Sequence, residues 1–492
     1  MFETGIRQFR MALGMAQGRR LDPRNVARLV DDVLATLAEF GDTGADAAEL
    51  IDGPMTNPEE RLEIANRGLR RTARRLAAQS PFYARRFASA QADPDKLDVA
   101  GLRAIPVTVK ADLVERPGDF RCTDVPAYLA TRTTGTTGRP TEVWLSRYEM
   151  ELWPALGALA AVLRGDLRPG DVMQVNLSSR STVAVHLAAA SCRLAGAGCR
   201  PLGVVPPEAA LDGMVEGGAT ILLTSPSYLA ELVTAARRAG LRAGDFRLRR
   251  LVVGGEVLSP SLARAAARTF GVPLVEDPYS MTEIVPVSGR ACSQGHQHHD
   301  LNLGLTELID LDTGEPAAPG ALGTLVITPY FPYRDCTPVF RYDTRDVARC
   351  LPDTSLRCEL AAIPATSQIL GKADHLLRIP GGAAAGGPGK SSTVVTPRQL
   401  IEAIESLPAE PWPARYRARV GEGTGRNGRI RLTLPASAIA GYGEAETRRH
   451  FAAAGLDIDL DIVGDDQAAS LRRTRSDMQE ITFASQHVLA GA

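Results

Sequence analysis

The middle of the chain alternates short apolar runs with amphipathic stretches, and this alternation restricts the fold more than any other feature. Residues 219–225 (ATILLTS) have the pattern of a strand, and residues 228–240 (YLAELVTAARRAG) have the pattern of a helix that ends at glycine. Residues 248–256 repeat the strand pattern and precede a second helical run, SPSLARAAARTFG. Strands that alternate with helices of this length pack as a largely parallel sheet, so the sequence predicts an α/β fold.

The segments on either side of this core predict additional elements. Residues 59–90 carry apolar side chains at helical spacing, whereas residues 306–329 place two β-rich runs around a turn-rich centre and predict an antiparallel pair. Residues 379–392 are rich in glycine and predict a surface loop, after which TPRQLIEAIESL predicts a helix and RIRLTLP a strand. We therefore expect a large α/β body with mixed sheets, followed by a small α+β domain.

Composition excludes several classes of protein. The formal net charge is −1 over 492 residues, so no global basic field attracts nucleic acid or anionic lipid. No apolar run reaches the roughly 18 residues of a membrane-spanning helix, and the N-terminus lacks the basic-then-apolar order of a signal peptide. Seven scattered cysteines favour reduced thiols over a disulfide framework. The sequence therefore predicts a cytoplasmic protein that binds neither nucleic acid nor a membrane.

A threonine- and glycine-rich segment, TRTTGTTGRPT at 131–141, has the composition of an anion-binding loop. Glycines let backbone N–H groups approach an anion closely, while threonine hydroxyls and an arginine add donors and charge. The segment lacks the spacing of a P-loop, and its composition also fits an ordinary surface loop, so both interpretations stay open. The residues that would hold phosphate are Thr133, Thr134, Gly135, Thr136, Thr137 and Gly138.

Four further segments follow this loop along the chain. They are GGE at 254–256, YSMTE at 279–283, RYDTRD at 341–346 and GKAD at 371–374. Together with the loop they resemble, in the same order, the motifs of the adenylate-forming superfamily, and the phrases SPFYARRF and IPVTVKADL resemble its phenylacetate–CoA ligase-like branch. The resemblance implies an N-terminal adenylate-forming domain over residues 1–371 and a small C-terminal lid domain over residues 372–492, with a hinge near Asp374.

The resemblance implies a ligase that uses ATP to convert an acid, an aromatic carboxylate in this branch, into a mixed anhydride with AMP. The acyl group would then pass to the thiol of CoA or to an amine. Fixed donors and Mg²⁺ stabilise the charge that develops at the α-phosphate. Thr282 would donate to that phosphate, Glu283 would hold Mg²⁺, and Lys372 would lie near the ribose and phosphates. The residues expected to contact adenosine are Gly254, Gly255, Glu256, Tyr279, Ser280, Met281 and Asp346, with Tyr279 stacked on adenine and Asp346 on the ribose hydroxyls.

The sequence departs from the family pattern near its C-terminal end. The family has a lysine there that contacts the acid and the α-phosphate, but no lysine follows Lys390, and the tail offers Arg472, Arg473 and Arg475. The planar guanidinium of arginine is not equivalent to an ammonium point charge. Three interpretations stay open: an arginine substitutes, the chemistry proceeds without a C-terminal cation, or the protein is a catalytically degenerate ATP- or AMP-binding protein.

Two glycines of the family pattern are also replaced, by Ser280 and by Arg345. These changes affect the acid pocket and the hinge side of the site, so they bear more on thioester formation with CoA than on adenylation. The second functional hypothesis is an ATP-dependent diazotase that activates nitrite for attack by an aromatic amine, because nitrite needs little pocket and no CoA tunnel. The branch also suggests a homodimer.

Cysteines and histidines gather in CSQGHQHH at 292–299. Some phenylacetate–CoA ligase-like proteins have a Cys…His pair here and a CPCG pair before the hinge. The resemblance therefore implies a structural zinc site, with Cys292, His298, Cys350 and Cys358 as its ligands and tetrahedral coordination. The CPCG sequence itself is absent, and the alternative is an exposed histidine-rich turn with unrelated buried cysteines.

Overall fold

The computed structural model describes residues 14, 18–41, 57–132, 141–273, 275–352, 356–379, 393–420, 429–468 and 471. Its described α-helices are α2 (Pro23–Phe40), α4 (Pro58–Gln79), α5 (Pro81–Ser89), α6 (Lys110–Glu115), α7 (Arg147–Leu163), α8 (Thr182–Leu194), α9 (Pro207–Glu216), α10 (Pro226–Arg238), α11 (Pro260–Phe270), α12 (Pro397–Glu405) and α13 (Glu444–Ala453).

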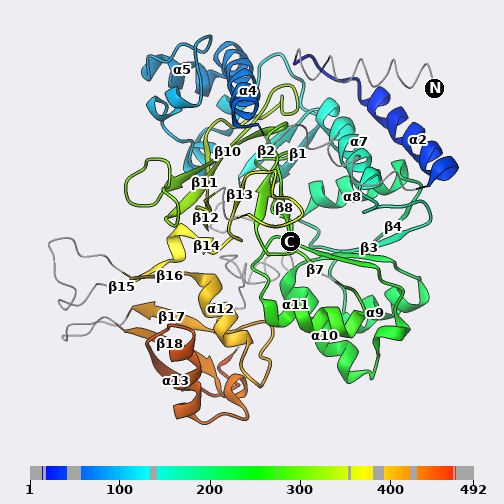
Figure 1. Cartoon of the computed structure of the whole chain (residues 1–492), viewed down its shortest axis with the longest axis vertical. Helices are drawn as coiled ribbons and strands as arrows, with labels where there is room; N and C mark the ends of the chain where they lie inside the picture. The colour runs from blue at the N-terminus through cyan, green and yellow to red at the C-terminus, as the bar shows by residue number, and fades with distance from the viewer. Residues whose placement is uncertain are drawn as a thin grey trace, which may run out of the picture.

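Parallel strands form the central sheet in the order β4-β3-β5-β6-β7. They are β3 (Val172–Asn176), β4 (Gly198–Pro201), β5 (Ile221–Thr224), β6 (Arg250–Val253) and β7 (Val275–Glu276). Helices α7 and α8 lie on one side of this sheet, and α9, α10 and α11 lie on the other (Figure 1). The two predicted strand–helix units are confirmed as β5–α10 and β6–α11, and the α/β class is confirmed with them.

Serine caps, prolines and glycines set the helix boundaries. Ser259 caps α11 by accepting from the N–H of Leu262, and the helix ends at Gly271, whose φ of 73° suits a residue without a side chain. The predicted helical segment 59–90 is confirmed and consists of two helices, α4 and α5. The break occurs because Ser80 is extended (φ −103°, ψ 113°) and Pro81, which has no N–H to donate, begins α5.

A four-stranded antiparallel sheet has the order β10-β11-β12-β14. Its strands are β10 (Gly304–Asp310), β11 (Leu322–Pro329), β12 (Tyr342–Arg349) and β14 (Gly371–Lys372). The β10–β11 pair confirms the predicted antiparallel pair. Strand β14 places Lys372 opposite Asp346 of β12. Gly371 has a φ of 124°, and a Cβ there would lie 2.5 Å from Pro397, so this crossing point accepts only glycine.

Two smaller sheets complete the larger part of the molecule. The antiparallel strands β1 (Leu129–Arg132) and β2 (Glu142–Leu145) form a two-stranded sheet. A three-stranded sheet has the order β13-β9-β8, with β8 (Gly289–Ala291), β9 (Gln297–His299) and β13 (Ala365–Thr366).

The last elements form a separate unit, drawn in yellow to orange in Figure 1 and called the C-terminal unit below. It contains α12, α13, β15 (Leu377–Ile379), β16 (Thr393–Val395), β17 (Arg417–Val420), β18 (Ile430–Pro435) and β19 (Ile458–Val463). The unit buries an apolar cluster of its own that includes Leu400, Ile404, Leu432 and Phe451. The helix and strand predicted after residue 392 are confirmed as α12 and β18.

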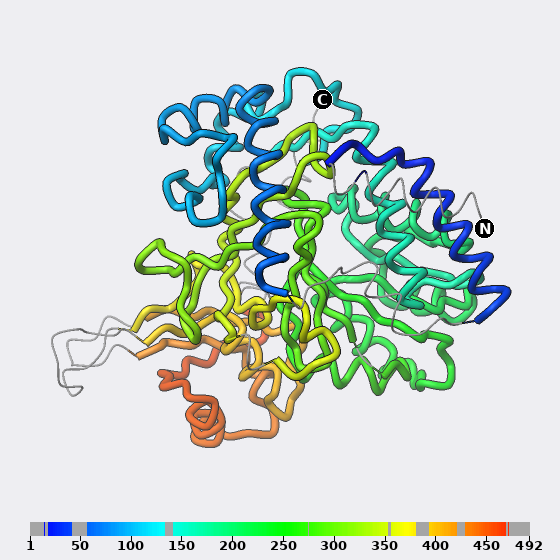
Figure 2. Tube along the Cα trace, turned by 45° about the horizontal axis from the view of Figure 1, so that its top comes forward, coloured from blue at the N-terminus to red at the C-terminus, as the bar shows by residue number. Residues whose placement is uncertain are grey.

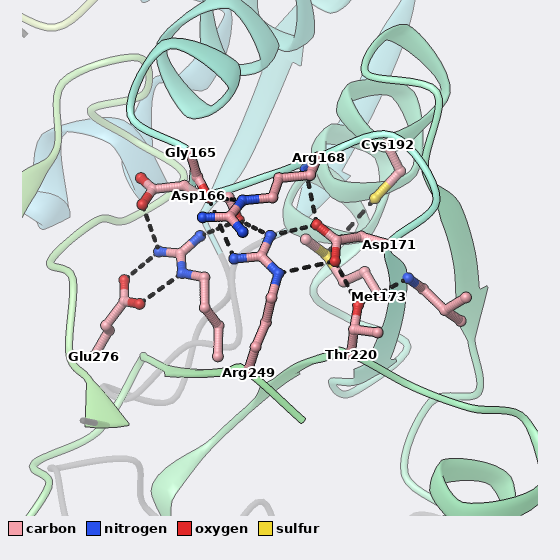
Figure 3. Close-up of polar contacts among 11 residues, drawn as sticks. Gly165, Asp166, Arg168, Asp171, Met173, Cys192, Thr220, Arg249 and Glu276 are labelled. Atoms are coloured by element: carbon pink, nitrogen blue, oxygen red, sulfur yellow. Dashed lines mark hydrogen bonds and ion pairs between the residues drawn. The ribbon is translucent and has the colours of Figure 1, made fainter. Parts of the chain in front are cut away.

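An ionic network ties the amino ends of the central strands together (Figure 3). Arg249, just before β6, forms a two-pronged pair with Asp171, just before β3, with Nε and Oδ1 2.9 Å apart. Asp171 also accepts from the Thr220 hydroxyl at 2.7 Å, which reaches it from the residue before β5. Arg250 extends the network by pairing with Glu276 of β7. The network therefore joins four strands at the edge opposite to their carboxyl ends.

Helix α2 packs along α7, on the side of the molecule away from the C-terminal unit (Figure 2). Its buried residues are Val26, Leu29 and Val30. None of the described helices combines the length and the apolar character needed to cross a bilayer.

Candidate active site

A cavity of about 1190 Å³ opens at the carboxyl ends of the parallel strands. Its wall contains the ends of β5 and β6, the segment that follows β7, and parts of β12 and β14. Loops diverge at this edge of a parallel sheet, which is why α/β proteins place ligand sites there. The motif segments at 254–256, 279–283, 341–346 and 371–374 all contribute side chains to this one cavity.

Asp346 lies at the centre of a polar cluster in the cavity. Its carboxylate accepts a hydrogen bond from the Tyr279 hydroxyl at 2.8 Å and forms an ion pair with Lys372 Nζ at 2.8 Å. Lys372 also donates to the carbonyl of Thr344 at 3.0 Å. Burial, together with the charge of Asp346, raises the pKa of Tyr279 well above its usual value, so the phenol stays protonated and donates.

Glu283 is a buried carboxylate, with 3% of the residue exposed, in the turn that follows Met281. Burial raises its pKa, and the cations Lys110, Lys372 and Arg334 oppose the rise. Thr282 lines the same cavity and is partly exposed. A carboxylate, a hydroxyl and two ammonium groups around one cavity form a set that suits a divalent cation together with phosphate oxygens.

Glu256 holds the local structure of the cavity wall. Its carboxylate accepts from the N–H of Ser227 at 3.0 Å and from the hydroxyl of the same residue, which fixes the start of α10. Gly254 and Gly255 follow β6 directly, and Gly255 has a φ of 86°. Ser280 is exposed and lines the cavity between Tyr279 and Met281.

The predicted phosphate loop, Thr133 to Gly138, lies outside the described residues, as do Arg472, Arg473 and Arg475. The hairpin that leads into the loop is described. Strands β1 and β2 form this hairpin, and their last paired residues are Arg132 and Glu142. Arg132 also lines the cavity. The chain therefore enters the loop segment from the cavity wall.

Several cavity residues were not among the predicted site residues, and three of them are charged groups close to the polar cluster: Asp277, Arg398 and Lys110. Asp277 is largely buried, and burial raises its pKa to about 7 although Arg398 opposes the rise. Arg398 comes from α12 of the C-terminal unit, and its Nη2 lies 3.8 Å from Asp277 Oδ2. A lone charged residue in an amphipathic helix or turn carries no signal of burial, so periodicity could not identify these three.

A second polar cluster lies beside the cavity, in the sheet of β8, β9 and β13. Cys292, His296, His298 and Cys358 each offer a ligand atom, and these atoms all lie within 4.8 Å of one another. The structure thus brings together three of the four predicted zinc ligands, leaves Cys350 out, and places His296 in the fourth position. The sequence could not separate these candidates, because the pairing of β13 with β9, which joins Ala365 to His298, decides which thiol lies near the histidines.

The side chains of this cluster fit a metal ion. His298 Nδ1 lies 2.8 Å from the carbonyl of Ile363, which leaves its Nε2 directed at the cluster, 3.3 Å from Cys358 Sγ. The Nδ1 atom of His296 is buried and has no hydrogen-bond partner in the described part of the chain. A buried imidazole nitrogen without a partner, in a cluster with two thiols and an imidazole oriented by a carbonyl, suits a tetrahedral Cys₂His₂ zinc site.

The sequence is similar to a known enzyme family and to characterised ligases. Residues 98–330 match the family model described as AMP-binding enzyme. A phenylacetate-coenzyme A ligase of Pseudomonas putida is 27% identical over 307 residues, which is 61% of this chain and 68% of that protein. A phenylacetate-coenzyme A ligase of Thermus thermophilus is 27% identical over 348 residues, covering 66% of this chain and 74% of that protein.

Solved structures agree in fold. A 2-hydroxyisobutyryl-CoA ligase in its postadenylation state superposes with a TM-score of 0.70 at 19% identity, covering 89% of this chain and 94% of that one. The same ligase in its thioesterification state gives a TM-score of 0.59 at 20% identity, over 89% and 94% of the two chains.

The fold, the cavity at the carboxyl edge of the sheet and the matched motifs define an ATP-dependent ligase of the adenylate-forming class. Residues 98–330 match the AMP-binding enzyme family, and the chain is similar to acid–CoA ligases of the adenylate-forming type. The family uses ATP and releases AMP, and its members act on small-molecule acids.

Proposed function

We propose that this chain uses ATP to convert an aromatic carboxylic acid into an acyl-AMP anhydride, releases pyrophosphate, and transfers the acyl group to the thiol of CoA. The observation that carries the proposal is the convergence of Tyr279, Thr282, Glu283, Asp346 and Lys372 on one cavity. The phenylacetate-coenzyme A ligases among its relatives support an aromatic acid and CoA as the co-substrates.

Each polar residue contacts a different part of ATP. Asp346 offers carboxylate oxygens to the ribose hydroxyls, and Tyr279 offers its ring to adenine. Thr282 donates to the α-phosphate, while Lys372 anchors Asp346 and stays within reach of the phosphates. When bound, Mg²⁺ held by Glu283 neutralises phosphate charge and thereby favours departure of pyrophosphate.

The apolar part of the cavity suits the acid. Val183, Ala184 and Leu187 come from α8, and Met281 and Val285 come from the turn that carries Glu283. Their side chains present an aliphatic wall beside the phosphate-binding residues. A flat hydrocarbon group buries its surface against such a wall while its carboxylate stays among the cations, which supports an arylacetate or a related acid.

We further propose that residues 1–371 form the adenylate-forming domain and residues 372–492 a lid that closes over the cavity. The separate apolar core of the C-terminal unit supports this division. Asp374, the proposed hinge residue, pairs with Arg345 at 2.5 Å, and Arg345 has a φ of 61° where the family pattern has glycine. Lid closure protects a hydrolysable anhydride from water. A homodimer and a cytoplasmic location stay predictions.

We also propose that Cys292, His296, His298 and Cys358 hold one structural Zn²⁺. The cluster lies on the sheet of β8 and β9, and Gly289 of β8 exchanges backbone hydrogen bonds with Tyr279 at 2.9 and 2.7 Å. A metal at the cluster would therefore fix the strand that positions the adenine-binding tyrosine.

The test is release of AMP and pyrophosphate from Mg·ATP by the full-length protein. The panel contains phenylacetate, benzoate and cinnamate, each with and without CoA, and nitrite together with an aminoaryl acid. Release that requires an aromatic acid and CoA supports the proposal. Release that requires nitrite and the arylamine would instead establish the diazotase, and ATP binding without turnover under every condition would favour a degenerate nucleotide-binding protein.

A further inference from the structure

Lysine is scarce in this chain, and the surroundings of its four lysines differ sharply. Lys96 is exposed, and its ammonium group lies 3.5 Å from the carboxylate of Asp93. Lys372 forms an ion pair with Asp346 and donates a hydrogen bond to the carbonyl of Thr344. Lys390 lies outside the described residues. Lys110 lines the cavity, and within the described part of the chain its ammonium group makes no hydrogen bond and no ion pair closer than 4.0 Å.

The backbone around Lys110 is fixed to the strand that carries Asp346. The N–H of Thr108 donates to the carbonyl of Arg341 at 2.8 Å, and the carbonyl of Thr108 accepts from the N–H of Asp343 at 2.9 Å. These two bonds extend β12 by one parallel bridge. Asp112 closes the first turn of α6 by accepting from the N–H of Val109 at 3.1 Å. Lys110 is the first residue of α6, and the hydrogen bonds of Thr108 and Val109 fix the backbone from which its side chain extends.

The charges that face Lys110 point to an anion. Burial lowers the pKa of its ammonium group, the buried carboxylate Glu283 raises it, and Lys372 lowers it further. Lys372 already pairs with Asp346, and Glu283 is the residue proposed to hold Mg²⁺. With Glu283 engaged in this way, Lys110 would be a partly buried cation that faces the phosphates and the acid.

We propose that Lys110 is a catalytic residue of adenylation, whose ammonium group binds the carboxylate of the acid and a non-bridging oxygen of the α-phosphate. The inference rests on the proposed function. In the step concerned, a carboxylate oxygen forms a bond to the α-phosphorus, the bond from that phosphorus to the bridging oxygen breaks, and pyrophosphate leaves with the electron pair. No proton is transferred, so Lys110 stays protonated and brings two anions together that would otherwise repel each other.

This role would remove the need for a cation from the C-terminal unit. No lysine follows Lys390 in the sequence, so the strongly basic side chains after this position are all arginines. A cation on α6 belongs to the same rigid part as Thr282 and Glu283, and it stays in place whatever the position of the lid. The adenylation site would then be complete without lid closure.

The kinetic test compares Lys110→Met and Lys110→Arg with the wild type in the full-length protein. The assay is acid-dependent exchange of labelled pyrophosphate into ATP, with phenylacetate as the first probe acid. We expect Lys110→Met to lower the exchange rate at saturating ATP by about 100-fold, the usual loss when one preorganised donor is removed, and Lys110→Arg to recover part of it. The matched control, Lys96→Met, should leave the rate unchanged. Exchange by Lys110→Met within about threefold of the wild type would overturn the inference.

A second measurement does not depend on the identity of the acid. Brief acetylation with acetic anhydride, read out by mass spectrometry of peptides, reports how accessible each lysine is. We expect Mg·ATP to protect Lys110 and to leave Lys96 unprotected. Failure of ATP to protect Lys110 would exclude it from the site. If no acid supports exchange in the wild type, the proposed function fails, but Lys110 protection still shows whether the residue faces the phosphates.

Discussion

At the scale of single residues, the burial of Asp277 beside the cavity lowers the stability of the folded protein when its carboxyl group is ionised. Its carboxyl group is largely buried, and Arg398 is the cation that faces it, at 3.8 Å. Burial raises its pKa to about 7 from the value near 3.8 of an unfolded chain. A carboxyl group with a raised pKa stabilises the folded state while it is protonated, so this contribution is lost as pH rises through 7.

Replacing Asp277 with asparagine should therefore stabilise the protein, and more so at high pH. We expect Asp277→Asn to raise the free energy of unfolding by about 1–3 kcal/mol at pH 8, because one pKa unit corresponds to about 1.4 kcal/mol. The gain should shrink towards pH 5, where the native carboxyl group is already protonated. Urea denaturation at both pH values measures the difference. A gain that is the same at pH 8 and pH 5 would contradict the assigned cause.

The sequence motifs identified the residues around Asp346 but not the charges that support them. Tyr279, Glu283 and Lys372 belong to motifs whose order along the chain resembles a family, so one sequence was enough to nominate them. Asp277 and Arg398 act together although they are separated by more than a hundred positions. No local pattern encodes that pairing, because it exists only once α12 has packed onto the larger part.

At the scale of elements, the amino-end network of Figure 3 locks the central strands in register. Arg249 holds Asp171 with two nitrogen atoms and also donates to the carbonyls of Gly165 and Asp166, at 3.2 and 2.9 Å. Although burial acts to raise the pKa of Asp171, the hydrogen bonds from Arg249 and Thr220 lower it overall. The network thus favours the ionised carboxylate.

We expect Arg249→Met to lower the free energy of unfolding by about 1–3 kcal/mol, since it leaves the Asp171 carboxylate without its cation and removes one of the two donors to each of the carbonyls of Gly165 and Asp166. Arg67→Met is the matched control, because Arg67 pairs with Glu63 on the exposed face of α4. That exposed pair should contribute less than about 0.5 kcal/mol. Equal losses in the two variants would show that the network does not stabilise the sheet.

The cysteine–histidine cluster supplies a second prediction at this scale. We expect one zinc ion per purified chain by inductively coupled plasma mass spectrometry. Cys358→Ser should lose the zinc and lower the melting temperature by about 5 °C or more, since a structural metal contributes directly to folding. Cys350→Ser is the matched control, because the structure leaves this thiol out of the cluster, and it should retain the metal. Loss of zinc in the Cys350 variant and retention in the Cys358 variant would reverse the assignment.

The sequence predicted elements better than it predicted their contacts. The strands β5 and β6 and the helices that follow them were evident from periodicity, because burial on one or two faces leaves a regular pattern. The choice between Cys350 and His296 was not evident, since it depends on how β9 and β13 pair. The register describes how two strands pair, so the sequence of one strand alone does not determine it.

At the scale of the whole molecule, three polar contacts from α12 hold the C-terminal unit against the larger part. Arg398 donates from Nη1 to the carbonyl of Leu258 at 2.9 Å and from Nε to the carbonyl of Ile369 at 2.6 Å. Glu405, at the end of the same helix, accepts from the hydroxyl of Ser259. Two of these bonds reach Leu258 and Ser259 at the start of α11, and the third reaches Ile369 before β14, so α12 is attached next to the cavity wall by polar groups that water could replace. An attachment of this kind suits a lid better than an apolar interface would.

The last prediction follows from this attachment. We expect Arg398→Ala to release the C-terminal unit, because the variant leaves Asp277 without its cation and two buried carbonyls without donors, a loss of about 3–5 kcal/mol at the interface. Hydrogen exchange should then accelerate in α12 and in the residues around Leu258, while β3 and β5 of the central sheet keep their protection. Arg429→Ala is the matched control, since Arg429 pairs with Asp457 on the surface of the same unit at 3.3 Å and should leave the exchange of α12 unchanged. Faster exchange throughout the chain would mean that Arg398 supports the whole fold, and unchanged exchange in α12 would mean that apolar packing, not these polar contacts, holds the unit in place.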